Sequence, residues 1–66
     1  ISMKEGKGNI VIFDDVLATG GTLAAVNELA VEAGYDVIDN VVLIDLKYVP
    51  RIDNFDLDVK SVVSYE

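Results

Sequence analysis

The 66-residue sequence contains no cysteine, no histidine and no tryptophan, and it has a single proline. The lack of cysteine excludes disulfide bridges and thiolate nucleophiles, and the lack of histidine excludes imidazole bases. Soft-metal centres, which draw their ligands from these two residue types, are excluded as well. Any metal ion bound by this chain must therefore be a hard cation held by oxygen ligands.

Positive charge is also scarce. Five lysine and arginine residues stand against twelve aspartate and glutamate residues, which gives a formal net charge of −7 at pH 7. Such an acidic chain is poorly suited to polyanions, so we expect no nucleic-acid partner. No apolar run approaches the roughly 20 residues that span a bilayer, and the N-terminal residues lack the pattern of a signal peptide. We expect no membrane association and a cytoplasmic location.

The length allows one small domain at most, and a core of this size is marginal on its own. Apolar residues make up 52% of the chain, which is typical of a globular protein and too many for a disordered one. The chain begins with Ile1 rather than methionine. We interpret this as a sign that the 66 residues are a piece of a longer protein.

The pattern of apolar residues predicts a strand followed by a helix. The run NIVIF, Asn9 to Phe13, is typical of a strand buried on both faces, and the polar residues 1–9 before it predict an approach loop. From Gly20 to Ala33, apolar residues recur at helical spacing, and Gly34 follows as a C-terminal cap. The predicted apolar face consists of Leu23, Val26, Leu29, Ala30 and Ala33, with Asn27, Glu28 and Glu32 placed elsewhere on the helix.

Two further strands are predicted, Asp36 to Leu46 and Asp58 to Tyr65, with residues 47–57 as a loop between them. Strand, helix and strand in this order require parallel pairing through a right-handed crossover. The fold class is therefore α/β, a partial parallel sheet made of a βαβ unit and a further strand. A parallel sheet normally carries helices on both faces, and this chain supplies only one helix. We assign the missing layer to sequence outside this chain or to a partner.

The segment Thr19-Gly20-Gly21-Thr22 has the composition of an anion-binding loop. Glycines let successive N–H groups converge on one ligand, and the start of a helix adds unpaired N–H groups. The helix dipole gives only about 0.3–1 kcal/mol, whereas millimolar affinity needs about 4 kcal/mol, so hydrogen bonds must supply the rest. The alternative is a tight turn with a threonine cap. The loop lacks both the lysine of a Walker A loop and the G-x-G-x-x-G pattern.

Asp14 and Asp15 close the apolar run of the first strand, at the carboxyl end where parallel sheets bind ligands. Carboxylates repel phosphate, so these side chains would contact vicinal sugar hydroxyls or a hydrated Mg²⁺. A solvated strand end is the alternative for an isolated pair of this kind. Beside an anion-binding loop, however, the pair favours a sugar phosphate as the ligand.

The stretch IVIFDDVLATGGTL, Ile10 to Leu23, resembles the phosphoribosyl pyrophosphate (PRPP) motif of type I phosphoribosyltransferases, and is most similar to their adenine-specific branch. The segments ISMKEGKG, NVVLIDL and DVKSVVSY resemble the strands and approach segment around that motif. The resemblance covers nearly all 66 residues, and it implies the C-terminal third or so of a single Rossmann-like phosphoribosyltransferase domain. One departure is Pro50, which precedes Arg51 where the adenine enzymes commonly have a glycine.

The resemblance also implies roles for particular residues. Asp14 and Asp15 would bind the ribose 2- and 3-hydroxyls, directly or through water on Mg²⁺. The 5-phosphate would be held by Ala18, Thr19, Gly20, Gly21 and Thr22. No catalytic residue would lie within this chain, because the catalytic loop, the pyrophosphate loop and the purine-recognising hood precede Ile1. We therefore expect no turnover from these 66 residues alone.

The activity implied by the resemblance is purine salvage, in which ribose 5-phosphate passes from PRPP to adenine and yields AMP and pyrophosphate. Mg²⁺ would be the cofactor, and the parent enzyme would be a homodimer. Three alternatives remain open: a phosphoribosyltransferase for another base, a non-catalytic regulator that binds PRPP, and a structural fragment without a ligand.

Overall fold

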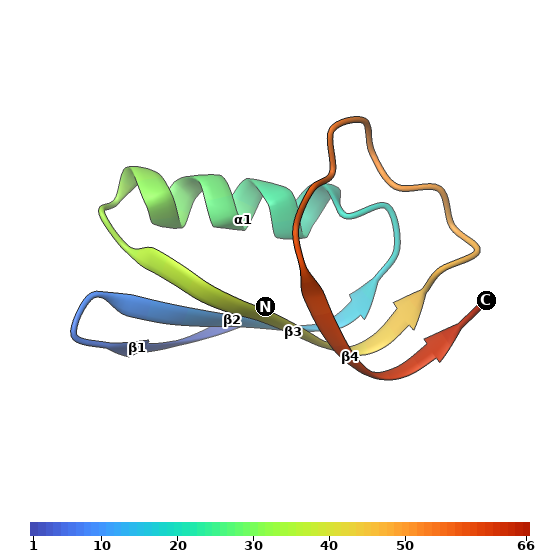
Figure 1. The fold of residues 1–66 in the computed structure, drawn as a ribbon, viewed down its shortest axis with the longest axis horizontal. Helices are drawn as coiled ribbons and strands as arrows, with labels where there is room; N and C mark the ends of the chain where they lie inside the picture. The colour runs from blue at the N-terminus through green and yellow to red at the C-terminus, as the bar shows by residue number, and fades with distance from the viewer.

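The computed structural model describes all 66 residues as a four-stranded sheet with one helix against it (Figure 1). The elements are β1 (Ser2–Gly6), β2 (Asn9–Leu17), α1 (Gly21–Glu32), β3 (Asp36–Leu46) and β4 (Val59–Tyr65). The strands lie side by side in chain order; β1 is antiparallel to β2, and β2, β3 and β4 are parallel to one another. The predicted α/β class and the βαβ unit with a further strand are confirmed.

Strand β1 corrects the prediction of an approach loop at residues 1–9. It pairs with β2 through a two-residue connection, Lys7 and Gly8, between the paired residues Gly6 and Asn9. Both connecting residues have positive φ, 49° and 87°. This is the backbone of a type I′ turn, whose twist matches that of the strands it joins. The turn imposes strand structure on a polar segment that has no apolar periodicity of its own.

The other strands lie close to their predicted positions. Strand β2 continues four residues past Phe13 to Leu17, so Asp14 and Asp15 lie within the strand rather than beyond its end. Strand β3 has the predicted bounds, and β4 begins at Val59, one residue later than predicted. Residues 47–57 form the irregular connection expected between them.

Helix α1 ends in the cap that the sequence predicts. Gly34 has a φ of +92°, its N–H donates to Val31 O, and the N–H of Tyr35 donates to Ala30 O, both at 3.0 Å. These are the two hydrogen bonds of a Schellman motif, which satisfies carbonyls at the end of a helix. At twelve residues, α1 is too short to cross a lipid bilayer, and the chain has no other helix.

The core lies between α1 and the sheet, and it consists of Ile12, Leu17, Leu23 and Val42. The predicted apolar face of α1 is partly wrong, since Leu29 is 65% exposed whereas Asn27 is 7% exposed. Asn27 is tolerated inside because its Nδ2 donates to Leu23 O and to Asn40 Oδ1, both at 2.8 Å. Asn40 Nδ2 donates in return to Asn27 Oδ1 at 3.2 Å. A buried amide pair with these partners leaves no polar atom unsatisfied.

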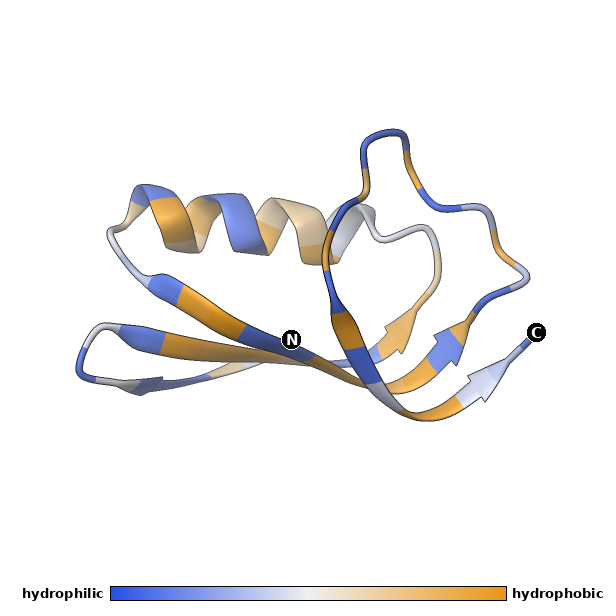
Figure 2. Cartoon of the chain, viewed as in Figure 1, coloured by the Kyte–Doolittle hydropathy of each residue, from blue (hydrophilic) through white to orange (hydrophobic).

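The opposite face of the sheet carries no helix. Figure 2 shows hydrophobic segments along β2, β3 and β4, which have α1 on one side only. Because side chains alternate along a strand, Phe13 and Leu43 point away from the core residues Ile12 and Val42. Phe13 is 39% exposed, Leu43 53% and Val62 71%. The sheet face left uncovered by this chain is therefore apolar.

Candidate functional site

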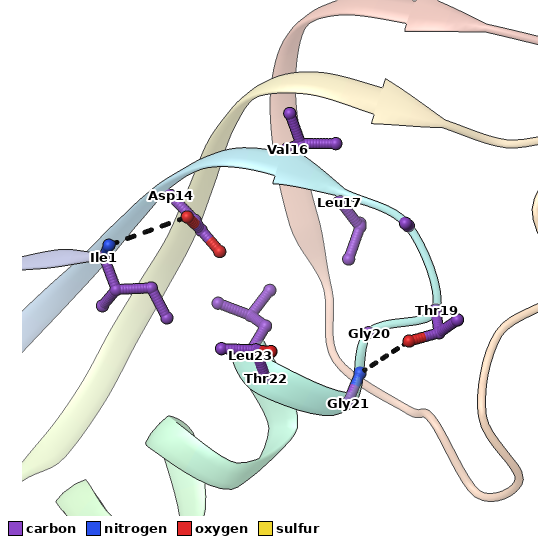
Figure 3. A pocket seen from close by; sticks show the side chains of 10 residues that line it. Ile1, Asp14, Val16, Leu17, Thr19, Gly20, Gly21, Thr22 and Leu23 are labelled. Carbon is purple, nitrogen blue, oxygen red and sulfur yellow. Dashed lines mark hydrogen bonds and ion pairs between the residues drawn. The ribbon is translucent and has the colours of Figure 1, made fainter.

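A cavity of about 340 Å³ lies between the end of β2 and the start of α1 (Figure 3). Its size falls in the range of small-ligand sites. It brings together Asp14 and all five residues predicted to hold a phosphate, Ala18 to Thr22, while Asp15 does not line it. The complete lining is Ile1, Asp14, Val16, Leu17, Ala18, Thr19, Gly20, Gly21, Thr22 and Leu23.

The anion loop, Ala18 to Thr22, presents backbone donors that nothing in the protein accepts. The N–H groups of Thr19, Gly20, Thr22 and Leu23 donate no hydrogen bond within the chain. The first bond of the helix runs from Ala24 N–H to Gly20 O at 2.9 Å. The predicted alternative of a threonine cap is weakly formed, since Gly21 N–H lies 3.4 Å from Thr19 Oγ1. Several donors at a helix start therefore remain free for an anion.

The two glycines of the loop differ in what the fold requires of them. Gly20 has a φ of +88°, and a Cβ added there would lie 2.5 Å from the ring of Phe55. Gly21 has an ordinary φ, and a Cβ added there would make only ordinary contacts, the nearest at 3.7 Å. Both its left-handed backbone and the nearby Phe55 ring therefore require a glycine at position 20. Neither conformation nor space requires a glycine at position 21, which lines the cavity.

The two adjacent carboxylates lie in different surroundings. Figure 3 shows the Asp14 side chain pointing toward the start of α1, where it lines the cavity beside the anion loop. Asp15 is exposed and borders a second hollow with Ser2 and Phe13, which Asp14 also lines. Asp14 Oδ1 accepts the Asp15 N–H at 2.8 Å, and Asp15 Oδ1 accepts the Val16 N–H at 2.9 Å. No backbone N–H and no basic side chain donates to the Oδ2 atom of either carboxylate.

The charge of Asp15 is favoured by its neighbours. Hydrogen bonding with the Asp14 side chain, followed by the bond from the Val16 N–H, lowers the pKa of the Asp15 carboxyl below its ordinary 3.8. A carboxylate that accepts hydrogen bonds is stabilised in its ionised form. Asp15 is therefore an anion at neutral pH, and it can accept hydrogen bonds from hydroxyl groups or from metal-bound water.

Comparison with known proteins shows which proteins share this sequence. An adenine phosphoribosyltransferase of Bdellovibrio bacteriovorus is 46% identical over 65 residues, which cover 98% of this chain and 39% of the relative. One from Hydrogenovibrio crunogenus is 34% identical over 67 residues, covering 100% and 39%, and one from Petrotoga mobilis is 42% identical over 57 residues, covering 85% and 33%. The chain belongs to the type I phosphoribosyltransferase family. No family model and no solved structure matches it.

The chain spans about 39% of the length of the first two of these phosphoribosyltransferases. The matched region includes the cavity and nearly every residue described above. The resemblance predicted from the motif Ile10 to Leu23 is thus confirmed at the level of the family.

The carboxylates of this phosphoribosyltransferase segment suit one kind of metal ion. No group of three or more histidine, cysteine, aspartate or glutamate residues lies together in a way that could hold a metal. Asp14 and Asp15 together offer two oxygens to which no N–H group donates. Mg²⁺ is commonly bound by one or two carboxylates while it keeps several waters and contacts substrate phosphates. The donor set fits such a shared Mg²⁺ and does not fit a metal enclosed by protein ligands.

Sequence reasoning missed a second group of residues at the phosphoribosyltransferase motif, namely those that hold the anion loop from outside the cavity. Arg51 donates to Ala18 O and to Asp45 Oδ1, and Phe55 packs against Gly20. These residues lie 25 or more positions along the chain from the loop. The one available signal was that Arg51 is the only arginine in the chain and follows the proline at which the family pattern is broken.

Proposed function

We propose that the chain is the C-terminal part of a phosphoribosyltransferase domain that binds PRPP and transfers its ribose 5-phosphate to adenine. The observation that carries the proposal is the cavity in which Asp14 faces a loop of unpaired backbone donors. Its two walls match the two chemical ends of a ribose phosphate, hydroxyls and phosphate. The names of the relatives, all adenine phosphoribosyltransferases, support adenine as the base.

In this proposal the 5-phosphate accepts hydrogen bonds from the N–H groups of the anion loop, Ala18 to Thr22. Charge-assisted bonds of this kind contribute about 1.5–3 kcal/mol each, so two or three of them suffice for millimolar binding. Asp14 accepts hydrogen bonds from the ribose hydroxyls at the other side of the cavity. Asp15, which faces away from the cavity, acts through water or through Mg²⁺.

The proposed reaction breaks the bond between ribose C1 and the pyrophosphate oxygen while a ring nitrogen of adenine attacks C1. Pyrophosphate leaves with the bonding electrons, and Mg²⁺ would neutralise the charge that develops on it. The residues of this chain hold the half of the substrate that does not react. Binding energy gained there fixes the position of C1 and lowers the barrier at the reacting centre.

Calorimetry tests the proposal on the product of the complete reading frame, titrated with PRPP and Mg²⁺. Gly21→Ala is the sharpest variant, because it adds a methyl group to a residue that lines the cavity without a clash inside the protein. Gly6→Ala is the matched control, since a Cβ there would clash with nothing and Gly6 also has an ordinary φ. We expect at least a tenfold loss of PRPP affinity for Gly21→Ala and none for Gly6→Ala. Equal affinities in all three proteins would show that the anion loop does not bind the phosphate.

Turnover assays separate the remaining candidates. AMP formation with adenine, and none with hypoxanthine, guanine or orotate, is the expected result. PRPP binding without turnover on any base would favour a regulator, and turnover on another base would correct the substrate. The cytoplasmic homodimer implied by the family resemblance belongs to the same proposal, and sedimentation of the complete protein measures its assembly state.

A further inference from the structure

The Arg51 side chain connects the loop 47–57 to the anion loop through a hydrogen bond. Arg51 Nη1 donates to Ala18 O, and it also approaches Leu46 O at 3.2 Å and Val49 O at 3.4 Å. Arg51 Nη2 donates to Asp45 Oδ1. The Asp45 side chain is only 10% exposed and that of Arg51 24%. One guanidinium thus joins the anion loop to the end of β3 in a largely buried setting.

Two further contacts act on the neighbouring residues of the anion loop. Ile52 N–H donates to Thr19 O at 2.8 Å. Phe55 covers Gly20 so closely that a Cβ there would lie 2.5 Å from its ring, and the Arg51 guanidinium lies 5.8 Å from the same ring centroid. Ala18, Thr19 and Gly20 are therefore each held by a residue of the loop 47–57. No residue of that loop lines the cavity, so the contacts come from outside it.

The planar peptide bond links the direction of each held carbonyl to the direction of the next N–H group. In a trans peptide the C=O of one residue and the N–H of the next point in opposite directions. The Ala18 carbonyl is held toward Arg51, so the N–H of Thr19 points away from the loop 47–57. The Thr19 carbonyl is held toward Ile52, so the N–H of Gly20 does the same. These are two of the N–H groups that no protein atom accepts.

We propose that Arg51 is a positioning residue for phosphate binding, which fixes the peptide planes of Ala18 and Thr19 so that the next N–H groups face the 5-phosphate. This inference rests on the proposed function. Arg51 does not bind the phosphate itself, because its guanidinium already bonds Asp45 and three carbonyls and lies outside the cavity. Lysine cannot replace it, since a single ammonium lacks the planar set of donors that reaches these acceptors together.

The experiment compares AMP with adenosine, which differ only in the 5-phosphate, on the product of the complete reading frame. Arg51→Gln is expected to lower the ratio of AMP affinity to adenosine affinity at least tenfold, with adenosine affinity changed less than twofold. Lys60→Gln is the control, because Lys60 also forms an ion pair with an aspartate, Asp39, but is far more exposed. Its ratio should stay at the wild-type value. A general loss of folded protein lowers both affinities and leaves the ratio unchanged.

Arg51→Lys keeps the charge and most of the side-chain length, so it covers the case in which Arg51→Gln does not fold. Its ratio is also expected to fall at least tenfold. A measurement on the wild-type protein is independent of both variants: AMP should shift the amide resonances of Thr19 and Gly20, and adenosine should not.

The outcomes separate this inference from the function on which it rests. A wild-type protein that binds AMP no better than adenosine refutes the phosphate site itself. A wild-type preference for AMP that Arg51→Gln or Arg51→Lys keeps within twofold leaves the phosphate site intact and overturns the role of Arg51. Unshifted Thr19 and Gly20 amides in AMP overturn it too.

Discussion

Gly20 and Gly34 are a matched pair for measuring how much stability is lost when a side chain is added within the anion loop. Both have left-handed backbones, with φ of +88° and +92°, but only Gly20 is crowded by Phe55. Gly34→Ala should lower the free energy of unfolding by about 1–2 kcal/mol, the cost of a left-handed alanine. Gly20→Ala should cost at least about 2 kcal/mol more, because its Cβ also has to displace an aromatic ring.

Urea denaturation of both variants, with Phe55→Leu added to each, measures the two contributions separately. Phe55→Leu should recover part of the loss at Gly20 and none of the loss at Gly34. Equal costs for the two alanine variants would show that Phe55 moves freely, which contradicts a tightly held anion loop.

The buried amide pair of Asn27 and Asn40 gives a second prediction at this scale. Asn27→Leu leaves the Asn40 amide without its partner, and it should destabilise the protein by about 1–3 kcal/mol. The double variant Asn27→Leu, Asn40→Val should regain most of that loss, because no unsatisfied polar group remains. Urea denaturation of the two single variants and the double variant gives the coupling between them. Strictly additive effects would mean that the two amides do not depend on each other.

The residues of the site could be predicted from the sequence only where the motif is contiguous. Asp14 and the anion loop lie within nine residues of one another, so their proximity follows from one strand and one turn. The outward placement of Asp15 follows from alternation along β2, but only because the strand continues to Leu17, four residues past its predicted end. The contacts of Arg51 depend on the path of an irregular loop, which is not set by periodicity, the main local signal that a single sequence offers.

At the level of the elements, the strongly patterned segments were predicted well and the hairpin was not. β3 is a long β-branched run, and α1 ends in a glycine cap, so both could be placed almost to the residue. β1 is polar and fully exposed along its length, and only the turn at Lys7 and Gly8 specifies it. Lysine is not a residue favoured for positive φ, so the turn could not be read from composition.

Strands β3 and β4 are joined by an exposed ion pair whose contribution depends on pH. Lys60 Nζ lies 2.8 Å from Asp39 Oδ2. The hydrogen bond from Lys60 lowers the pKa of Asp39 below 3.8, and the same bond raises the pKa of Lys60 above 10.5. The contribution of Asp39 is present above pH 3.8 and is lost as the pH falls through its folded value. That of Lys60 is present below pH 10.5 and is lost as the pH rises through its folded value.

The melting temperature of the wild type should therefore exceed that of Lys60→Met by a small, constant margin between about pH 5 and 9, as for other exposed pairs. The margin should shrink below pH 3.8 and above pH 10.5. Thermal melts across this range provide the measurement, and 1 M salt should reduce the margin because the pair is exposed. A margin that grows in acid would contradict the assigned pair.

For the molecule as a whole, the surface is large for the mass. The 7.1 kDa chain exposes 4492 Å², against about 4,100 Å² for a compact monomer of this size. It measures 36 × 24 × 16 Å, and only 10 of its 66 residues are buried. The excess arises from a sheet covered on one side. A parallel sheet with one bare apolar face is incomplete by the rule that such sheets are buried on both faces.

The proposal that this chain is the C-terminal part of a larger domain makes that bare face a buried surface in the complete protein. Leu43→Ala, in the middle of the face, should then destabilise the product of the complete reading frame by more than about 2 kcal/mol, because removing a buried side chain loses apolar contacts and leaves a cavity. Val31→Ala is the control: Val31 is 63% exposed on α1, close to the 53% of Leu43, and its substitution should change stability by less than about 0.5 kcal/mol. Urea denaturation of both variants measures the two costs. If Leu43→Ala costs no more than Val31→Ala, the face stays exposed to water, and the single-domain proposal has to account for an open sheet.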